Sequence, residues 1–467
     1  MTQPLWHWDE LVAAAEGRPD GTPAAAITGF SIDTRTLSPG DVFVALEAAR
    51  DGHTFVGDAF AAGAAAALVS KGYRRGRNDG ALLRADDSLA ALEAIGRAAR
   101  LRSNARVVAV TGSAGKTGTK EMLRLCLAEV GATHASEKSY NNRWGVPLTL
   151  ARMPQAAQFG VFEIGMNHAG EIAPLARLVR PHAAVITAVE PVHLQYFRSV
   201  EDIAEAKAEI LQGLVPGGSA VLPHDNPHFP LLRDRASGVG AGIVSFGYME
   251  AADVRCIQAN MDARGSSVIA GVGSRRFPYR IGAPGEHYVK NSLGVLAALM
   301  ALGADAMRCL PALVRVTAPA GRGARTLLDG GRILLIDESY NANPVSMRAA
   351  LAAMATVPRA DFPRRVAVLG DMLELGEGSA DLHCGLKEAV DAAGIDLVYA
   401  CGPTMKLLFD RLKPTQQGAW TQESAQLAPA LLDAVRAGDV VMIKGSLATR
   451  MVPLVEALQA RFSRVGG

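Results

Sequence analysis

The chain has 467 residues, of which 49% are hydrophobic and 20% are charged, and its formal net charge is +2. This length exceeds what one hydrophobic core can organise, so we expect about two to four globular domains. The near balance of charges excludes a general nucleic-acid binder or a binder of anionic membranes, and we expect neither partner.

Cysteine usage and the N-terminal residues indicate the compartment. The five cysteines are widely spaced and include no CxxC pair, which argues against a disulfide framework or a zinc site and favours a reducing environment. The N-terminal residues lack a signal-peptide pattern, and no run of about 18 apolar residues could span a bilayer. We therefore expect a cytoplasmic protein without membrane insertion.

Residues 1–103 are numerous enough for a domain of their own. Their patterns predict helices over 6–15, 55–66 and 88–101 and short strands over 26–34, 41–46, 67–70 and 81–84. Ser31, Asp33 and Arg35 form a polar cluster within this unit. An arginine beside an aspartate could hold a phosphate or a ribose hydroxyl, whereas the spacing alone favours a surface ion pair in a turn.

The stretch RVVAVTGSAGKTGTKEM, residues 106–122, is the main functional signal. Its apolar residues 107–110 predict a buried strand, and a helical pattern begins after a glycine-rich turn. This geometry directs free backbone N–H groups and a helix N-terminus at a phosphate, with Lys116 adding charge and the Thr117 hydroxyl placed to bind magnesium. Gly112 precedes Gly115 by only three positions, so the general phosphate-loop pattern is not met.

Residues 104–320 continue with strands expected over 160–164, 183–189 and 219–222, separated by helices. Such alternation implies a mostly parallel sheet with ligands at its carboxyl edge, and residues 243–279 suggest a small antiparallel addition. Glu163 and His193 follow strands of this sheet and could join Thr117 around a metal. Carboxylate and hydroxyl oxygens suit Mg²⁺, whereas imidazole is an unusual ligand for it, so His193 could instead cap or support its neighbours.

Two more residues of this unit have an ambiguous environment. Lys207 lies on the inward face of a helix expected over 199–214. A lysine buried there needs a partner or a changed chemical state. Alternatively, Lys207 lies at the edge of the apolar stripe and extends its ammonium group to water. Asn291 lies in the first turns of the helix after GAPGEH. Its side chain could meet an adenine edge or face solvent.

Residues 321–467 predict a third α/β unit, with strands over 332–336, 366–370, 397–401 and 440–443. Asn343 is expected to cap a helix whose first residue is Pro344. Gly321-Arg322-Gly323 reads as the hinge before this unit, and Arg322 could enter the phosphate site when the domains close. The fold class that follows is α/β in three domains, 1–103, 104–320 and 321–467.

Several motifs, spread in order over nearly the whole chain, carry a family resemblance. They are TGSAGKTGTKE, Asn141-Asn142 before GVPLTL, EIGMNHAGEI, AKAEIL, YNANP, LGDMLELG and IKGS. Together they resemble the Mur ligase family, the ATP-dependent amino-acid ligases of peptidoglycan synthesis. The resemblance implies an N-terminal UDP-substrate domain, a central P-loop parallel-sheet ATPase domain and a C-terminal Rossmann-like domain.

YNANP and LGDMLELG are most similar to the branch that joins D-alanyl-D-alanine to UDP-N-acetylmuramoyl-tripeptide through an acyl phosphate. The products would be the UDP-muramoyl-pentapeptide, ADP and phosphate. Two alternatives stay open: a branch that adds diaminopimelate or lysine to UDP-muramoyl-dipeptide, and, from another class, a non-catalytic nucleotide-binding protein. The expected ligands are ATP, Mg²⁺ and these small-molecule substrates, and we expect a monomer.

The resemblance also assigns roles to individual positions. It implies an ATP site formed by Gly112, Ser113, Ala114, Gly115, Lys116, Thr117, Gly118, Asn291, Arg322, Asp337, Tyr340 and Asn341. It implies one magnesium on Thr117 and Glu163 and a second on His193 and a carbamylated Lys207, with Lys116 and Arg322 as further catalytic groups.

The same resemblance implies substrate contacts at Ser31, Asp33, Arg35, Asn141, Asn142, Lys444, Ser446 and Arg450. Arg143-Trp144 departs from the family pattern, in which a glutamate and an aliphatic residue are more usual at these positions. The contacts to the peptide substrate are therefore expected to differ there.

Overall fold

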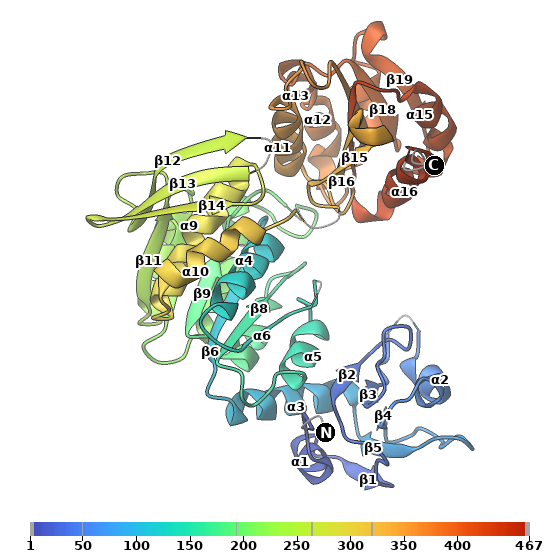
Figure 1. Cartoon of the computed structure of the whole chain (residues 1–467). Helices are drawn as coiled ribbons and strands as arrows, with labels where there is room; N and C mark the ends of the chain where they lie inside the picture. The colour runs from blue at the N-terminus through green and yellow to red at the C-terminus, as the bar shows by residue number, and fades with distance from the viewer. Residues whose placement is uncertain are drawn as a thin grey trace.

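The computed structural model describes residues 4–48, 50–137, 139–192, 194–262, 265–318 and 321–462. It contains three α/β units in chain order, each built on its own sheet (Figure 1). The first unit is blue in Figure 1, the second runs from cyan to yellow, and the third is orange to red. The expected α/β fold is thus confirmed. The three sheets fall inside the ranges expected for the domains, whose limits remain a prediction.

The first unit holds a five-stranded sheet in the order β1-β5-β4-β3-β2. Its strands are β1 (Arg18–Asp20), β2 (Gly29–Ser31), β3 (Asp41–Val44), β4 (Ala66–Ser70) and β5 (Ala81–Ala85). Its helices are α1 (Trp8–Ala14), α2 (Val56–Ala61) and α3 (Ser88–Arg102), with a 3₁₀ turn over Gly52–Phe55. All neighbouring strands are parallel except β1, which pairs antiparallel with β5 and was not predicted. Asp87 begins α3 by accepting a hydrogen bond from Ala90 N at 2.8 Å.

The second unit holds a nine-stranded sheet in the order β14-β13-β12-β11-β10-β9-β6-β8-β7. The first six strands of this sheet in chain order are β6 (Arg106–Thr111), β7 (Thr133–Ala135), β8 (Phe159–Glu163), β9 (Ala183–Ile186), β10 (Ser219–Pro223) and β11 (Gly242–Gly247). The last three are β12 (Val254–Asp262), β13 (Gly265–Val272) and β14 (Arg275–Ile281). The antiparallel part expected over 243–279 is β12 to β14, but it extends the main sheet, because β12 pairs parallel with β11.

Helices cover both faces of the central sheet. They are α4 (Lys116–Ala128), α5 (Gly145–Ala151), α6 (Ile172–Val179), α7 (Val200–Ala208), α8 (Phe229–Gly238), α9 (Glu286–Ala301) and α10 (Ala306–Cys309). Strand β6 alternates its side chains between the two faces: Val108 and Val110 join the core under α4 and α9, and Val107 and Ala109 the core under α6 and α7. The helix expected over 199–214 is α-helical over Val200–Ala208 and continues as a 3₁₀ turn over Glu209–Gly213.

The third unit holds a six-stranded sheet in the order β15-β16-β20-β17-β18-β19, parallel except for β15. Its strands are β15 (Ala324–Leu328), β16 (Ile333–Glu338), β17 (Arg364–Gly370), β18 (Leu397–Cys401), β19 (Gln417–Thr421) and β20 (Asp439–Lys444). Its helices are α11 (Pro344–Ala355), α12 (Ser379–Cys384), α13 (Lys387–Ala392), α14 (Met405–Phe409), α15 (Ala428–Ala434) and α16 (Val452–Phe462).

The expected cap of α11 is present. Ser346 N donates to Asn343 Oδ1 at 2.8 Å, and Asn343 N donates to Ser346 Oγ at 3.0 Å, so each residue satisfies a free amide of the other. Because Pro344 follows at the first helical position, the helix begins at a fixed point beside the hinge. None of the helices in the described ranges is both long enough and apolar enough to cross a membrane.

Candidate active site

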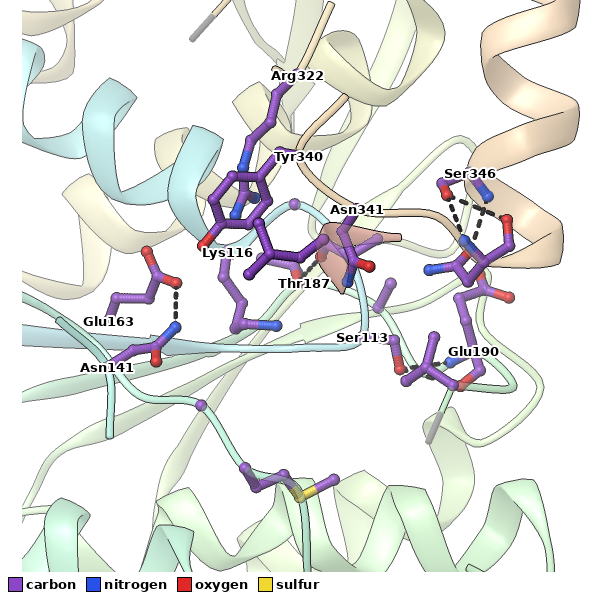
Figure 2. Close-up of a pocket in the computed structure, with 18 of the residues that line it drawn as sticks. Ser113, Lys116, Asn141, Glu163, Thr187, Glu190, Arg322, Tyr340, Asn341 and Ser346 are labelled. Carbon is purple, nitrogen blue, oxygen red and sulfur yellow. Dashed lines mark hydrogen bonds between the residues drawn. The ribbon is translucent and has the colours of Figure 1, made fainter. Parts of the chain in front are cut away.

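A cleft of about 1390 Å³ lies where the carboxyl edge of the central sheet meets the hinge and the third unit. The expected site residues that line it are Ser113, Ala114, Gly115, Lys116, Gly118, Asn141, Asn142, Glu163, Asn291, Arg322, Tyr340, Asn341, Lys444 and Ser446. Residues that are far apart in the sequence therefore come together in one place (Figure 2). The expected residues outside this lining are Gly112, Thr117, Lys207, Asp337, Ser31, Asp33, Arg35 and Arg450. His193 lies outside the described residues.

The loop between β6 and α4 requires glycine at two positions. Gly112 has φ +152°, and a Cβ there would lie 1.9 Å from Thr187 Oγ1. Gly115 has φ +81°, and a Cβ there would lie 2.7 Å from Asn291 Oδ1. Asn291, buried in α9, therefore packs directly on the loop. Because side chains are excluded at both glycines, the loop backbone remains open to a ligand in the cleft.

The loop is fastened to the segment that follows β9. Thr187 Oγ1 donates to Ala114 O at 2.5 Å, and Ser113 N donates to Ala188 O at 2.8 Å. Ser113 Oγ accepts from Glu190 N at 2.9 Å and donates to Glu190 O at 3.1 Å (Figure 2). These bonds hold the loop in one shape before any ligand binds, which lowers the cost of ordering it around a phosphate.

Lys116 places a cation at the base of this loop. Its Nζ donates to Gly112 O at 2.7 Å and therefore folds back over the loop. Burial lowers the pKa of Lys116, the nearby Glu163 carboxylate opposes that shift, and Arg322 adds to it. The charges of the loop, of β8 and of the hinge thus act on one another across the cleft. Such a concentration of charged groups suits a polyanionic ligand.

Two buried oxygens at this end of the cleft fit a divalent cation. Asn141 Nδ2 donates to Glu163 Oε1 at 2.7 Å and fixes the carboxylate. Within the described ranges, the other carboxylate oxygen, Glu163 Oε2, and Thr117 Oγ1 are buried without a hydrogen-bond partner. Hard oxygen donors of this kind suit Mg²⁺. The described residues contain no group of three or more His, Cys, Asp and Glu that could hold a metal.

Lys207 occupies the inward face of α7, as its spacing predicted, and only 2% of it is exposed. Burial lowers its pKa well below the ordinary 10.5, and the charge of Lys116 acts in the same direction. The amine is therefore held toward its neutral, nucleophilic form, which is the form that can react with carbon dioxide.

The hinge is organised by Asp337. One of its carboxylate oxygens accepts from Gly321 N at 2.8 Å, and the other accepts from Ser339 Oγ at 2.6 Å. Its side chain is thus engaged behind the cleft, and its contact with nucleotide stays a prediction. Tyr340 N donates to Gly321 O at 3.0 Å, and the Arg322 guanidinium lies 4.1 Å from the centre of the Tyr340 ring (Figure 2).

Comparison with known proteins identifies the family of this three-part architecture. The family models described as "Mur ligase middle domain" and "Mur ligase, glutamate ligase domain" match residues 110–299 and 325–447. The UDP-N-acetylmuramoyl-tripeptide–D-alanyl-D-alanine ligase of Escherichia coli is 35% identical to this chain, over 93% of this chain and 94% of that protein. The chain belongs to the Mur ligase family.

Other relatives of this Mur ligase give the same result. The enzyme of the same name from Bacillus subtilis is 32% identical over 92% of this chain and 93% of its own. A crystal structure of MurF from Acinetobacter baumannii superposes with a TM-score of 0.84 at 29% identity, covering 97% of this chain and 99% of that one. MurF ligase from Thermotoga maritima in complex with ADP has a TM-score of 0.77 at 26% identity, covering 93% and 98%.

The third unit of this Mur ligase contributes a buried cation to the cleft. Lys444 Nζ lies 3.1 Å from Glu338 Oε2 and donates to Asn341 O at 2.9 Å. Ser446 Oγ accepts from Leu373 N at 2.9 Å, so it joins two loops of the cleft wall. Arg450 is exposed and lies outside the lining. The expected carboxylate contacts of these three residues stay predictions.

The expected substrate residues of the first two units have local partners. Arg35 forms a 2.6 Å ion pair with Asp33 and is 86% exposed, and Ser31 Oγ donates to Asp33 O at 2.9 Å. This is the ion pair in a turn that the spacing favoured, and contact with a uridine diphosphate remains a prediction. Asn142 Oδ1 accepts from Gly145 N at 2.9 Å and thereby helps to begin α5 at the cleft wall.

Some lining residues were not found from the sequence, chiefly Thr187, Glu190, His287 and Ser346. A signal existed for the first two, because they follow a strand expected to end at the ligand edge of the sheet. Glu190 contacts the loop through its backbone N–H and carbonyl, which residue type does not reveal, whereas Thr187 contacts it through its hydroxyl.

Proposed function

We propose that this Mur ligase joins D-alanyl-D-alanine to UDP-N-acetylmuramoyl-tripeptide at the expense of ATP, in the cytoplasm. The observation that carries the proposal is the 35% identity over 93% of the chain to the E. coli enzyme of that name. The cleft supports it, because a phosphate loop, the Glu163 carboxylate and a wall from a separate unit line one space.

The first step would transfer the γ-phosphoryl group of ATP to the terminal carboxylate of the tripeptide. A bond forms between a carboxylate oxygen and phosphorus, the bond from phosphorus to the bridging oxygen breaks, and ADP leaves. Lys116 and the N–H groups of the loop would neutralise the phosphate oxygens. Thr117 and Glu163 would hold Mg²⁺, which supplies further neutralisation of phosphate charge when bound.

The second step would be attack by the amine of D-alanyl-D-alanine on the acyl phosphate. The attack forms the C–N bond and gives a tetrahedral intermediate. Its collapse breaks the bond between carbon and the phosphate oxygen, phosphate leaves with that electron pair, and the nitrogen releases a proton to water to give the amide. No side-chain nucleophile is needed, so positioning and charge neutralisation carry the rate. Arg322 would leave the Tyr340 ring for the transferring phosphoryl group, and a carbamate on the neutral Lys207 amine would supply an anionic ligand for a second metal.

Phosphate release tests the proposal directly. Purified protein is given ATP, Mg²⁺ and UDP-muramoyl-tripeptide, with and without D-alanyl-D-alanine, and the product is weighed by mass spectrometry. We expect release that requires both substrates and a product with the mass of UDP-muramoyl-pentapeptide.

Two other results would contradict it. Turnover of UDP-muramoyl-dipeptide with diaminopimelate or lysine, and none with D-alanyl-D-alanine, would place the chain in the neighbouring branch of the family. Binding of ATP without turnover of either pair would favour a nucleotide-binding protein.

A further inference from the structure

Two unlike charges and an indole ring line one part of the cleft. Glu93 comes from α3 of the first unit, and Arg143 and Trp144 come from the segment that leads into α5. We call these three residues the Glu93–Arg143–Trp144 cluster. Helices α3 and α5 pack on each other, so the cluster lies at the junction of the first two units.

The charges of this cluster are available to a ligand. Across the described ranges, the side chains of Glu93 and Arg143 form no hydrogen bond and no ion pair with the protein. The Arg143 guanidinium lies 5.3 Å from the centre of the Trp144 ring. Burial raises the pKa of Glu93, while Arg97 and Arg143 act to lower it. A cation and a carboxylate that both face a cleft without pairing are complementary to a ligand that carries both charges.

The cluster is close to the reacting end of the peptide in the proposed function. Asn141, which holds the Glu163 carboxylate at 2.7 Å, is two residues before Arg143. Since consecutive Cα atoms are about 3.8 Å apart, the Cα of Arg143 lies within about 8 Å of that of Asn141. The carboxylate to be phosphorylated belongs to the third residue of the tripeptide, so the side chain of that residue starts beside Glu163 and must end nearby.

The third residue of the tripeptide is either diaminopimelate or lysine, and the two side chains differ in charge at their far ends. Both are methylene chains with a terminal ammonium group, and diaminopimelate carries a carboxylate at the same end. We infer that the Glu93–Arg143–Trp144 cluster binds this side chain and selects the diaminopimelate class over the lysine class. Arg143 pairs with the distal carboxylate, Glu93 accepts from the distal ammonium, and the indole covers the methylenes. This inference rests on the proposed function and adds its substrate class.

The test compares kcat/KM for two UDP-muramoyl-tripeptides, one ending in diaminopimelate and one in lysine. The wild-type chain should prefer diaminopimelate by about 10- to 100-fold, the value of one charge-assisted pair. Arg143→Ala should lower kcat/KM for the diaminopimelate substrate by that factor and change the value for lysine by less than about twofold. Arg143→Lys, which keeps the charge without the bidentate fork, should retain part of the preference.

Two further variants complete the design. Glu93→Gln should lower kcat/KM for both substrates, because both carry the distal ammonium. Arg74→Ala is the matched control, since Arg74 is an exposed arginine outside the cleft lining and should leave both values unchanged. Arg143 is itself exposed, so its replacement is compatible with a folded chain, which the thermal midpoint verifies.

The outcomes separate this inference from the proposed function. Equal losses on both substrates in Arg143→Ala would mean that Arg143 binds a group common to them, such as an acidic group earlier in the peptide, and would overturn the inference. A wild-type chain that turns over both substrates without preference would also overturn it, while the proposed function would stand. Absence of turnover with either substrate would overturn the proposed function and this inference with it.

Discussion

The two carboxylate oxygens of Glu163 have different surroundings. One oxygen is fixed by Asn141, while Oε2 is buried and lacks a partner within the described ranges, as does the hydroxyl of Thr117. An unsatisfied buried oxygen costs free energy, so these positions are explained if a cation completes them.

We expect Glu163→Gln to reduce phosphate release by about 10²- to 10³-fold at millimolar Mg²⁺, because the amide cannot supply the negative charge. A titration of Mg²⁺ in the steady-state assay measures this effect, and chelation of the metal should abolish wild-type activity reversibly. Glu171→Gln is the control, since Glu171 lines the same cleft but already bonds Asn167 N at 2.8 Å. Equal Mg²⁺ requirements in the wild type and in Glu163→Gln would contradict the assignment.

Lys120 supports the backbone of the strand that carries Glu163. It is fully buried, its Nζ donates to Ser136 O at 2.8 Å, and it pairs with Glu121 at 2.7 Å. The Ser136 hydroxyl in turn accepts from Glu163 N at 3.3 Å. Two consecutive contacts, both made through Ser136, thus connect the helix after the phosphate loop to the strand that carries Glu163.

Lys120→Met should lower the free energy of unfolding by about 1–3 kcal/mol, because the Ser136 carbonyl loses its buried donor. It should also raise the Mg²⁺ concentration needed for half-maximal activity. Urea unfolding and the Mg²⁺ titration measure the two effects. Lys387→Met, which removes an exposed pair with Asp391, should change stability by less than about 0.5 kcal/mol. If Lys120→Met and Lys387→Met had the same free energy of unfolding and the same Mg²⁺ requirement, the supporting role of Lys120 would be refuted.

The loop between β6 and α4 has no room for a side chain at Gly112. Gly112→Ala would place a methyl group 1.9 Å from Thr187 Oγ1 at a φ of +152° that alanine avoids. We expect the variant to fold but to lose ATP affinity by at least about tenfold, because the backbone amides can no longer converge. Titration calorimetry with ATP and Mg²⁺ measures this. Gly238→Ala serves as the control, as its Cβ would meet no atom within 4 Å.

Elements whose pattern is local were predictable, and those defined by pairing were not. The buried strand at residues 107–110 and the helix capped by Asn343 follow from apolar spacing and cap chemistry, and both were found. Strand β1 was missed because its three residues, Arg-Pro-Asp, are largely exposed and become a strand only by pairing with β5. In the same way, spacing could not tell that Asp337 turns toward the hinge amides, since that choice depends on the folded loop.

At the scale of the whole molecule, the cleft exists only because units are brought together. The loop and Glu163 come from the second unit, Tyr340 and Lys444 from the third, and Glu93 from the first. Because the described lining is divided among the three units, the reaction proposed here depends on how the units meet. This is why the sequence could name the candidate residues one by one, while their convergence needed the structure.

Protonation of histidines that the fold shields from water should limit the stability of the chain in acid. Burial lowers the pKa of the fully buried His383, and partial burial lowers that of His134 and His182, below the ordinary value of about 6.5. His383 shows the cause, because its Nδ1 donates to Ser379 O at 2.7 Å and its Nε2 accepts from Met372 N at 2.9 Å. A protonated ring has no acceptor, so the second bond would be lost.

The sign follows from proton binding. Below pH 6.5 the unfolded chain binds protons at these histidines while the folded chain resists them, so stability falls as pH decreases through this window. Above it, these three histidines are neutral in both states and add no slope. Urea midpoints measured between about pH 5 and pH 7.5 should therefore rise with pH and then level off. His383→Gln should flatten the acidic part of that curve, and a variant curve parallel to that of the wild type would show that His383 titrates freely in the folded chain.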